Sequence, residues 1–422
     1  MTEERSHKLI IVGCGASGMM AGCIAGLYSD DVLILDANNV PGKKLLATGN
    51  GRCNFTNIFV REDRFNLPDY SPAMDIYKKF DFEDVLIFFE RLGVPVRIKD
   101  NYCYPYNLEA VSIRDSLVGR LEELGVKIKL TNRIKSVSKD PDNGRFSLVT
   151  DSGYTYEADK VILACAGLAG SSFGCDGSVF DILKSLGATN ITKPLPALVG
   201  LTSRSPYLHE LAGVRAMAKV TLYVNGKTFK NESGEIIFSN TGISGIPIMD
   251  LSRHAARFLD EGQKCSVALD FFEELSGDDL EQMLKNMIFG RSVTAENAFT
   301  GILNHKLLNV VLRASHTAGV KCDSDDFKLS SFINLLKSFE LDITGTAGFD
   351  NAQVTTGGLS LEETDPNTME AKFCKGLYIT GETLDVDGLC GGYNLQWAWS
   401  TGALAGACAT AGTLDKTKLF TV

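Results

Sequence analysis

The sequence lacks every cysteine arrangement that would indicate a metal site or a redox-active pair of thiols. Its 11 cysteines are scattered along 422 residues, with no Cys-x-x-Cys and no cluster at zinc or iron–sulfur spacing. This distribution is typical of a reduced, cytosolic protein rather than of a disulfide framework. We therefore predict a cytoplasmic protein without a metal centre, in which Cys14, Cys23 and Cys165 are small packing residues within apolar runs.

Positive charge is also in short supply. The 42 Lys and Arg are outnumbered by 52 Asp and Glu, which gives a formal net charge of −10. Such an acidic balance argues against nucleic acid or an anionic membrane as the main partner. Residues 5–28 resemble a signal peptide, because Arg5 precedes an apolar run, but the glycines within them and the acids Asp30 and Asp31 that follow favour a strand, a turn and a helix instead. We expect no export, no membrane span and a small-molecule substrate; the oligomeric state stays open.

What the sequence does contain is a glycine-rich turn near each end. The first, residues 13–18, reads Gly-Cys-Gly-Ala-Ser-Gly; it follows an apolar strand at 9–12 and opens an Ala/Gly-rich helix at 16–27. In a dinucleotide-binding unit, Gly13 permits the tight turn, Gly15 lets the backbone approach the pyrophosphate, and Gly18 lets the helix pack closely on the strand. The amides at the helix N-terminus then face the phosphates.

An acidic residue completes this fingerprint. A second apolar strand, residues 32–35, ends on Asp36. A carboxylate at that position accepts hydrogen bonds from the adenosine ribose and would repel a 2′-phosphate. The unit therefore predicts a bound dinucleotide other than NADP.

The second turn distinguishes FAD from NAD. Residues 388–396 read Gly-Leu-Cys-Gly-Gly-Tyr-Asn-Leu-Gln and begin a helix that we expect to reach about residue 409; a short buried strand at 375–382, ending in Gly-Glu, precedes them. An FAD extends from adenine to isoalloxazine, and its flavin end can use such a helix N-terminus to stabilise negative charge on the reduced ring. NAD would not need this distant second anchor, so the two turns together predict FAD.

Three segments resemble the signatures of one family. They are residues 42–57, which contain Gly-Lys-Lys and Asn-Phe-Thr-Asn, residues 381–396, and residues 241–245, Thr-Gly-Ile-Ser-Gly. They are similar to those of the YhiN/BaiN-like FAD flavoproteins, whose members include aminoacetone oxidase-like and bile-acid dienone reductase-like proteins, and the resemblance spans essentially the whole chain. One departure is that Ile246 precedes Pro247, where the family usually has proline directly after the second glycine. The resemblance implies an FAD-dependent oxidoreductase and flavin contact by residues 42–57.

The candidate cofactor-binding residues come from these turns and from the ends of the expected strands. They are Gly13, Gly15, Ala16, Ser17, Gly18, Asp36, Lys43, Lys44, Gly49, Asn50, Gly51, Arg52, Cys53, Asn54, Ile134, Ala166, Gly167, Gly381, Glu382, Gly391, Gly392, Tyr393, Asn394, Leu395 and Gln396.

Several of these side chains have two possible roles. Lys43 and Lys44 could neutralise phosphate charge or be exposed lysines that serve solubility. Glu382 could bind the ribityl chain or an ordered water, or cap the following loop. Asn394 and Gln396 could contact the pyrimidine edge of the flavin or cap the helix. Arg52 is the stronger candidate, because its glycine-rich loop should bend against the flavin, whereas Ala166 and Gly167 form either a cofactor-facing turn or a tight loop.

No residue can be assigned as the catalytic acid, because the flavin itself carries the chemistry. Cys390 is a weak candidate, since it lies just ahead of a helix N-terminus that could lower the pKa of its thiol. The histidines of the middle region are candidate proton donors, although each is more often structural: His209, His254, His305 and His316. We expect a packing role for Tyr102, Tyr104 and Tyr106; the alternative is that they form a wall of the substrate site.

The fold class we predict is α/β, a discontinuous Rossmann-like FAD-binding domain with inserted β-rich and helical domains. The first part of the FAD domain covers 1–193, the insertion, a substrate or cap region, covers 194–345, and the second part covers 346–422. Pro194 and Pro196 indicate the crossing between domains, alternation at 220–238 indicates strands, and residues 277–340, which lack proline, are helical in pattern. Residues 61–80, which are polar and carry Pro68 and Pro72, are expected to form a surface excursion.

The sequence has no second Gly-x-Gly-x-x-Gly. A nicotinamide donor must therefore approach the flavin transiently, through the cleft that also admits substrate. The leading prediction is an FAD-dependent reductase that uses NAD(P)H, by ping-pong hydride transfer through flavin N5, to reduce an activated C=C bond of an apolar carbonyl substrate, as the bile-acid branch implies. An oxidase of a small amine such as aminoacetone, producing hydrogen peroxide, and a non-catalytic flavin redox sensor are the alternatives.

Overall fold

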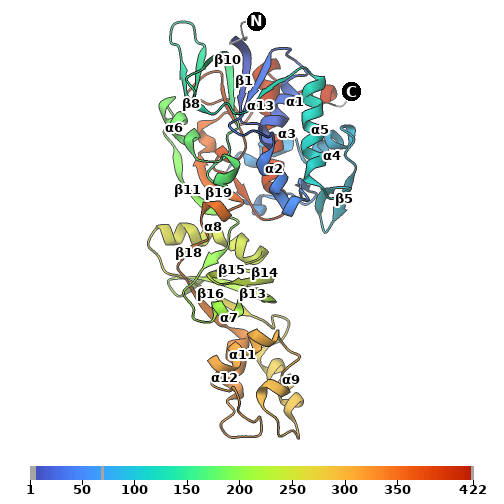
Figure 1. Cartoon of the computed structure of the whole chain (residues 1–422), viewed down its shortest axis with the longest axis vertical. Helices are drawn as coiled ribbons and strands as arrows, with labels where there is room; N and C mark the ends of the chain where they lie inside the picture. Colours follow the sequence, from blue (N-terminus) through green and yellow to red (C-terminus); the bar gives the residue numbers. More distant parts are fainter. Residues whose placement is uncertain (1–5, 68–70, 420–422) are drawn as a thin grey trace. The chain divides into compact units, whose positions relative to one another are not determined.

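The computed structural model describes residues 6–67 and 71–419 and divides into two compact units (Figure 1). Unit 1 comprises Met1–Leu195 and Val354–Val422, and unit 2 comprises Pro196–Gln353. The boundaries therefore fall at 195/196 and 353/354, where the sequence analysis placed them at 193/194 and 345/346. Arg5 and Pro68, which entered two of the expectations above, lie outside the described residues.

A seven-stranded sheet is the centre of unit 1. Five strands run parallel in the order β7-β2-β1-β10-β20, and β8 and β9 add an antiparallel meander to the other end of β10. The strands are β1 (Ser6–Val12), β2 (Val32–Leu35), β7 (Lys127–Lys129), β8 (Ile134–Lys139), β9 (Phe146–Thr150), β10 (Thr155–Leu163) and β20 (Leu377–Ile379). This is the Rossmann-type α/β architecture that the glycine-rich βαβ unit predicted.

Helices cover this sheet, and smaller elements surround it (Figure 1). The helices of unit 1 are α1 (Ala16–Ala25), α2 (Lys43–Ala47), α3 (Ala73–Lys79), α4 (Phe82–Arg91), α5 (Ala110–Glu123), α6 (Ser178–Ser185), α13 (Tyr393–Ala411) and α14 (Lys416–Leu419). A three-stranded sheet, β3-β6-β5, is formed by Thr56–Asn57, Tyr102–Pro105 and Val96–Lys99. Two further strands are β11 (Ile191–Ala197) and β19 (Val354–Leu359).

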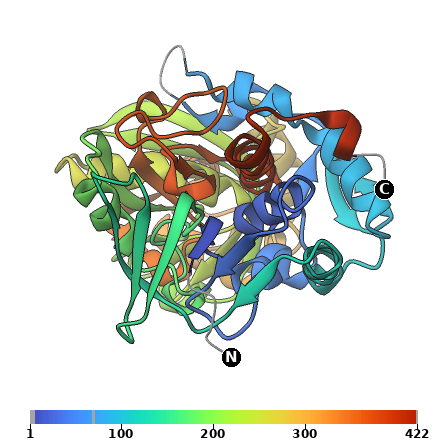
Figure 2. The same ribbon diagram turned by 90° about the horizontal axis from the view of Figure 1, so that it is seen from above.

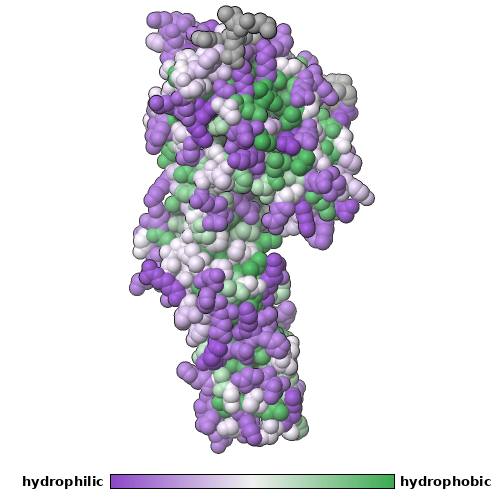
Figure 3. Space-filling view, in the orientation of Figure 1, coloured by the Kyte–Doolittle hydropathy of each residue, from purple (hydrophilic) through white to green (hydrophobic). Residues whose placement is uncertain are grey.

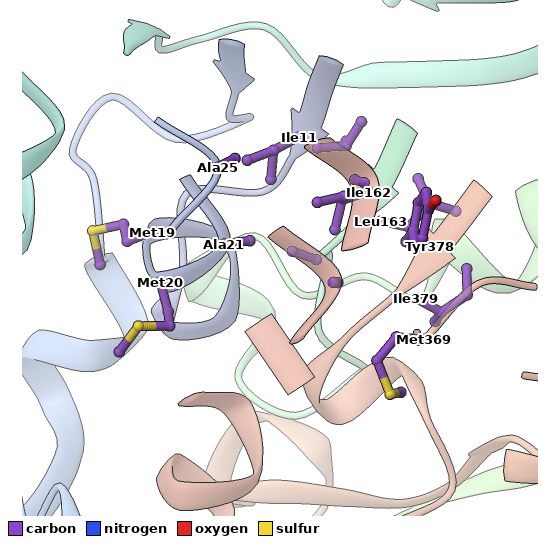
Figure 4. Packing of buried hydrophobic residues seen from close by; sticks show 14 of the residues in the cluster. Ile11, Met19, Met20, Ala21, Ala25, Ile162, Leu163, Met369, Tyr378 and Ile379 are labelled. Carbon is purple, nitrogen blue, oxygen red and sulfur yellow. The ribbon is translucent and has the colours of Figure 1, made fainter. Parts of the chain in front are cut away.

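The helices that begin at the two glycine-rich turns pack side by side (Figure 2). Glycines on α13 make this possible: a Cβ on Gly402 would lie 2.4 Å from the carbonyl oxygen of Ser17, and one on Gly406 would lie 2.3 Å from that of Ala21. Figure 4 shows Met19, Met20 and Ala21 of α1 in the same buried cluster as Ile162 and Leu163 of β10 and Tyr378 of β20. The core of unit 1 therefore fixes the starts of both helices relative to the sheet.

The expectation of a surface excursion at 61–80 is wrong for much of that stretch. Helix α3 buries Ala73, Ile76 and Tyr77 and packs against α13. These three side chains recur at the i, i+3, i+4 spacing of an amphipathic helix, a pattern too short to stand out among the polar residues around it. Ahead of α3, β4 (Phe65–Asn66) pairs with β21 (Asp387–Gly388), the strand that leads into the second glycine-rich turn.

Unit 2 combines an antiparallel sheet with helices. Its seven strands follow the order β17-β16-β13-β14-β15-β12-β18, and they are β12 (Leu201–Thr202), β13 (Arg215–Val224), β14 (Lys227–Ser239), β15 (Gly242–Ser244), β16 (Cys265–Asp270), β17 (Phe339–Ile343) and β18 (Gly345–Thr346). The helices are α7 (Leu208–Leu211), α8 (Ile246–Asp260), α9 (Gly277–Ile288), α10 (Ala295–Ala298), α11 (His305–Ala314) and α12 (Leu329–Lys337). The strands expected at 220–238 and the helical pattern of 277–340 both appear. In the described parts of both units, no helix has the length and apolar character that crossing a membrane requires.

Candidate functional site

The three glycines of the first turn differ in their steric surroundings. Gly13 has φ 105°, and a Cβ there would lie 2.3 Å from the carbonyl oxygen of Ala164. A Cβ on Gly18 would lie 1.9 Å from the carbonyl oxygen of Gly13, so only glycine lets α1 start this close to the turn. At Gly15, by contrast, no atom lies within 4 Å of the Cβ position. The chain thus leaves open space at the position that a pyrophosphate would approach, and this cradle fits a dinucleotide.

Asp36 lies beside this turn, at the end of β2. Its buried carboxylate accepts one hydrogen bond of 2.6 Å from the backbone N–H of Cys14 and another of 2.6 Å from that of Asn38. Burial and the nearby Asp36 charge both raise the pKa of the Cys14 thiol, so this cysteine is a neutral packing residue. A carboxylate has further lone pairs for ribose hydroxyls, and Asp36 is therefore fixed at the place where the fingerprint requires an acceptor.

Lys44 and Glu382 form a part-buried ion pair of 2.7 Å. The second Glu382 oxygen accepts a hydrogen bond from the backbone N–H of Thr355 at 3.0 Å. Burial alone would lower the pKa of Lys44, but the Glu382 carboxylate raises it above its ordinary value. Lys44 is thus a structural cation of the site, whereas Lys43 is half-buried and donates to the carbonyl oxygen of Ser172 at 2.7 Å. Contact of either lysine with phosphate stays a prediction.

The loop after β10 is tight and adjoins this ion pair. Ala166 has φ 61°, in the left-handed region, and its carbonyl oxygen accepts the Thr383 hydroxyl at 3.0 Å. A Cβ on Gly167 would lie 2.4 Å from the Thr355 hydroxyl oxygen, which accepts the N–H groups of Leu168 and Ala169. The two threonines were not found from the sequence, because an isolated threonine carries no spacing signal.

Residues 48–57 contact the second glycine-rich turn directly. Asn57 donates through its side chain to the carbonyl oxygen of Gly391 at 2.9 Å, and a Cβ on Gly392 would lie 2.7 Å from the carbonyl oxygen of Thr56. The Trp399 indole N–H donates to the carbonyl oxygen of Phe55 at 2.8 Å. The structure thus brings together two signatures that are more than 300 residues apart in the chain.

The glycine-rich part of that segment has an unusual backbone. Gly49, Asn50 and Gly51 are successive left-handed residues, with φ of 57°, 54° and 81°. No atom lies within 4 Å of a Cβ position at Gly51, and Arg52 beside it is exposed. The side chain of Asn54 accepts the backbone N–H of Cys103. This loop therefore presents an open backbone surface, as a flavin-binding loop would, while flavin contact itself stays a prediction.

The side chains of the second helix start hold the turn itself. Asn394 accepts the N–H of Gly388 at 2.8 Å and donates to the carbonyl oxygen of the same residue at 2.9 Å. Gln396 is fully buried and hydrogen-bonds to the Thr56 hydroxyl and the carbonyl oxygen of Phe80. No side chain caps α13, whose N-cap is Gly392, so the capping alternative for Asn394 and Gln396 is wrong. Both act as positioning residues here, and contact with the pyrimidine edge of a flavin stays a prediction.

Tyr393, Leu395 and Ile134 complete the set of candidates. The Tyr393 hydroxyl donates to the carbonyl oxygen of Phe59 at 3.2 Å, and Leu395 is half-buried against the core. Ile134 is buried at the start of β8, opposite Thr150 of β9. It belongs to the meander and not to either glycine-rich turn.

The cysteines of the site separate into two kinds. Cys53 is fully buried, and burial raises its pKa to about 12, so its thiol is a neutral group packed in the core. Cys390 is half-buried in the second turn.

Among the described residues, no three His, Cys, Asp or Glu side chains are grouped so that they could hold a metal ion.

The four candidate histidines all lie in unit 2. Burial, with help from Arg253, lowers the pKa of His254 to about 4. Its ring lies 5.1 Å from that of Phe229, so it is a neutral packing residue. His209, His305 and His316 are on or beside short helices of the same unit. None of the four can be assigned as a proton donor from its surroundings.

The comparisons with known proteins settle the family. The family described as the HI0933-like protein Rossmann domain matches residues 7–408. The chain belongs to this family. It is 36% identical over 409 residues to the 3-dehydro-bile acid delta(4,6)-reductase of Clostridium scindens, and the matched region covers 96% of this chain and 99% of that protein. It is 30% identical over 408 residues to the ribosomal RNA dihydrouridine synthase of Escherichia coli, covering 95% of this chain and 96% of that protein.

Among solved structures, the chain matches 3-ketosteroid delta1-dehydrogenase from Sterolibacterium denitrificans with 12% identity and a TM-score of 0.47, over 97% of this chain and 100% of that one. Membership in the HI0933-like family confirms the resemblance found in the sequence and the Rossmann fold class. It also confirms the prediction of an FAD-dependent oxidoreductase. The electron donor stays a prediction.

Proposed function

We infer that the protein is an FAD-dependent reductase that uses NAD(P)H to reduce an activated C=C bond of an apolar carbonyl substrate, by ping-pong hydride transfer. The observation that carries this proposal is the 36% identity, over almost the full length of both chains, to a reductase of 3-dehydro-bile acids. The second relative supports the same bond type, because dihydrouridine differs from uridine by saturation of a C=C bond conjugated to a carbonyl. In both names the reduced bond is an enone-like alkene.

The described residues fit the cofactor. The open backbone at Gly15, the fixed carboxylate of Asp36 and the exposed left-handed loop at Gly51 would hold FAD from one glycine-rich turn to the other. When bound, FAD supplies the two-electron carrier between donor and acceptor. The protein contributes binding and orientation: the Lys44–Glu382 pair fixes the backbone N–H of Thr355, and Asn394 fixes the turn at Gly388.

The acceptor we propose is a small molecule, handled in the cytoplasm without a nucleic-acid or membrane partner. The net charge of −10 supports this choice, since a polyanionic RNA would be repelled by most of the surface. In the overall reaction one hydride and one proton add across the C=C bond, and NAD(P)H leaves as NAD(P)⁺. Atoms and electrons therefore balance without molecular oxygen.

The test is anaerobic turnover of the holoenzyme with NADH or NADPH and a steroid-type 4-en-3-one, with the corresponding saturated ketone as the control. We expect nicotinamide oxidation with the enone alone, and a product two mass units heavier than the substrate. Hydrogen peroxide production from aminoacetone in air, with no enone reduction, would instead identify an amine oxidase. Reduction of uridines in RNA, with no turnover of enones, would contradict the small-molecule acceptor.

A further inference from the structure

The hairpin β5–β6 carries cations and tyrosines on one face. In its antiparallel register Arg97 lies opposite Tyr104, and Lys99 lies opposite Tyr102. Residues directly opposite one another in a sheet point to the same side, so these four side chains share one face. Cys103 and Pro105, which alternate with the tyrosines, are buried. The face of the hairpin that carries the tyrosines therefore points away from the core.

Two more residues extend this surface. The Arg97 guanidinium lies 4.6 Å from the centre of the Tyr106 ring, and Tyr106 is 58% exposed. Burial raises the pKa of the Tyr104 hydroxyl, and the Arg52 charge lies close enough to oppose that rise. We name the set Arg52, Arg97, Lys99, Tyr102, Tyr104 and Tyr106 the hairpin face.

The cations of the hairpin face keep their charge available. Within the described part of the chain, none of the three cations Arg52, Arg97 and Lys99 forms an ion pair with a carboxylate. Asp100, at the hairpin turn, is close enough to act on the pKa of Tyr104. In the region of Figure 3 where Figure 1 places β5, hydrophilic residues lie beside smaller hydrophobic areas, and Ile98 of β5 is 51% exposed. In a chain of net charge −10 the three cations are a local concentration of positive charge.

The hairpin face adjoins the second glycine-rich turn. A Cβ on Gly391 would lie 2.9 Å from the Tyr102 ring. Asn57, which lies opposite Tyr102 in β3, donates to the carbonyl oxygen of Gly391 at 2.9 Å. The surface therefore begins at the turn to which the flavin end of the cofactor is assigned.

We propose that the hairpin face is the docking site of the nicotinamide dinucleotide that reduces the flavin. The proposal rests on the reductase function inferred above. The only Gly-x-Gly-x-x-Gly of the sequence is assigned to FAD, so the donor needs another site. A dinucleotide carries at least two phosphate charges and two planar rings; arginine and lysine are suited to bind the phosphates, and the half-buried rings of Tyr102 and Tyr104 and the exposed ring of Tyr106 are suited to contact the planar rings. An apolar carbonyl acceptor would make no use of three cations.

Charge complementarity also accounts for a transient donor. Cations on an otherwise acidic surface attract a dianion and raise its association rate, without holding it as a buried site would. The dinucleotide can then leave before the acceptor enters, as ping-pong turnover requires.

The test measures the reductive half-reaction of the holoenzyme by anaerobic stopped-flow. In the double variant Arg97→Gln/Lys99→Gln, the apparent Kd for NADH or NADPH should rise about tenfold, as expected for two lost charge contacts. The limiting rate of reduction, the flavin content and the flavin spectrum should not change. Arg215→Gln/Lys227→Gln is the charge-matched control, because Arg215 of β13 and Lys227 of β14 are exposed in unit 2, and it should behave as the wild type. Added salt should weaken donor binding in the wild type more than in the double variant.

An unchanged Kd in a double variant with full flavin content would overturn the proposal. A second outcome would also overturn it: the double variant loses affinity for a single-stranded uridine-rich oligoribonucleotide, while its Kd for the donor is unchanged. The hairpin face would then be an RNA site. A third measurement tells failure of the proposed function apart from these two outcomes. Enzyme reduced with dithionite is mixed with the enone, which tests the enone half-reaction without the nicotinamide donor. If reduced wild type and double variant both reduce the enone at the same rate, the acceptor half stands whatever the donor result.

Discussion

Lys44 and Glu382 form a 2.7 Å ion pair although 338 residues separate them in the chain. Lys44 lies in α2, and Glu382 lies in a short 3-10 turn, Gly381–Thr383, which follows β20 and precedes the second glycine-rich turn. Because Glu382 also binds the backbone of Thr355, the pair links three segments of unit 1 at the candidate cofactor site.

Replacing Lys44 by Met should destabilise the protein and reduce its flavin content. Removal of one partner leaves the part-buried Glu382 carboxylate without its counter-charge, and we expect a loss of about 2 kcal/mol in the free energy of unfolding. Lys43→Met is the matched control, since Lys43 is also half-buried but donates to a carbonyl oxygen rather than to a carboxylate. Urea unfolding and flavin absorbance of both variants measure the effect; equal losses in the two variants would show that the ion pair has no special weight.

Substitution by alanine should affect protein stability at Gly18 and FAD affinity at Gly15. Gly18→Ala forces a Cβ against the carbonyl oxygen of Gly13, so the apoprotein itself should unfold at lower urea. Gly15→Ala meets no protein atom, so the apoprotein should keep its stability while its affinity for FAD falls, because the new methyl group occupies the space for the pyrophosphate. Unfolding of the apoproteins together with FAD titration separates the two effects. Unchanged FAD affinity in Gly15→Ala would place the cofactor elsewhere.

Cys390→Ala should retain both flavin and turnover. The chemistry is assigned to the flavin, and no metal-binding group of residues accompanies this thiol in the described chain. Steady-state turnover per bound flavin is the measurement. If turnover were abolished while the flavin stayed bound, Cys390 would be a catalytic thiol.

Glu363 predicts a pH-dependent part of the stability. Burial alone would raise its pKa, but hydrogen bonds from the hydroxyl and N–H of Thr189 and the N–H of Asn190 lower it below the ordinary value of 4.5. A carboxyl whose folded pKa is lowered stabilises the protein above the unfolded pKa, and this contribution disappears as pH falls through the folded pKa. Glu363→Gln should therefore cost at most about 1 kcal/mol at neutral pH, because water screens the group. The difference in the free energy of unfolding between Glu363→Gln and the wild type should shrink below pH 4.5. A difference that grows as pH falls would have the wrong sign for this account.

Much of unit 1 could be predicted because its elements carry strong local signals. The strand, turn and helix around Gly13, Gly15 and Gly18 follow from glycine sterics, and each glycine meets, or leaves open, the atoms that its role requires. The 19-residue helix α13 follows from a long apolar and small-residue run after a glycine-rich turn.

The rest of the site depends on contacts between distant segments, which no local pattern contains. Thr355 and Trp399 were missed, because their roles come from partners far along the chain at Leu168 and Phe55. Asn394 was correctly placed in the second turn, but the sequence could not show that its amide holds Gly388. The tyrosines of β6 were expected to pack or to form a substrate wall; their register with Arg97 and Lys99, which joins them to a charged face, appears only once β5 is paired.

The most direct test of the central claim is anaerobic mixing of the purified yellow protein with NADH and, separately, with NADPH, while the visible flavin band is followed. The account predicts rapid bleaching by at least one of them, and recovery of the band when a 4-en-3-one is added without oxygen. A band that persists with both nicotinamides, in protein that demonstrably contains flavin, would contradict a nicotinamide-driven reductase.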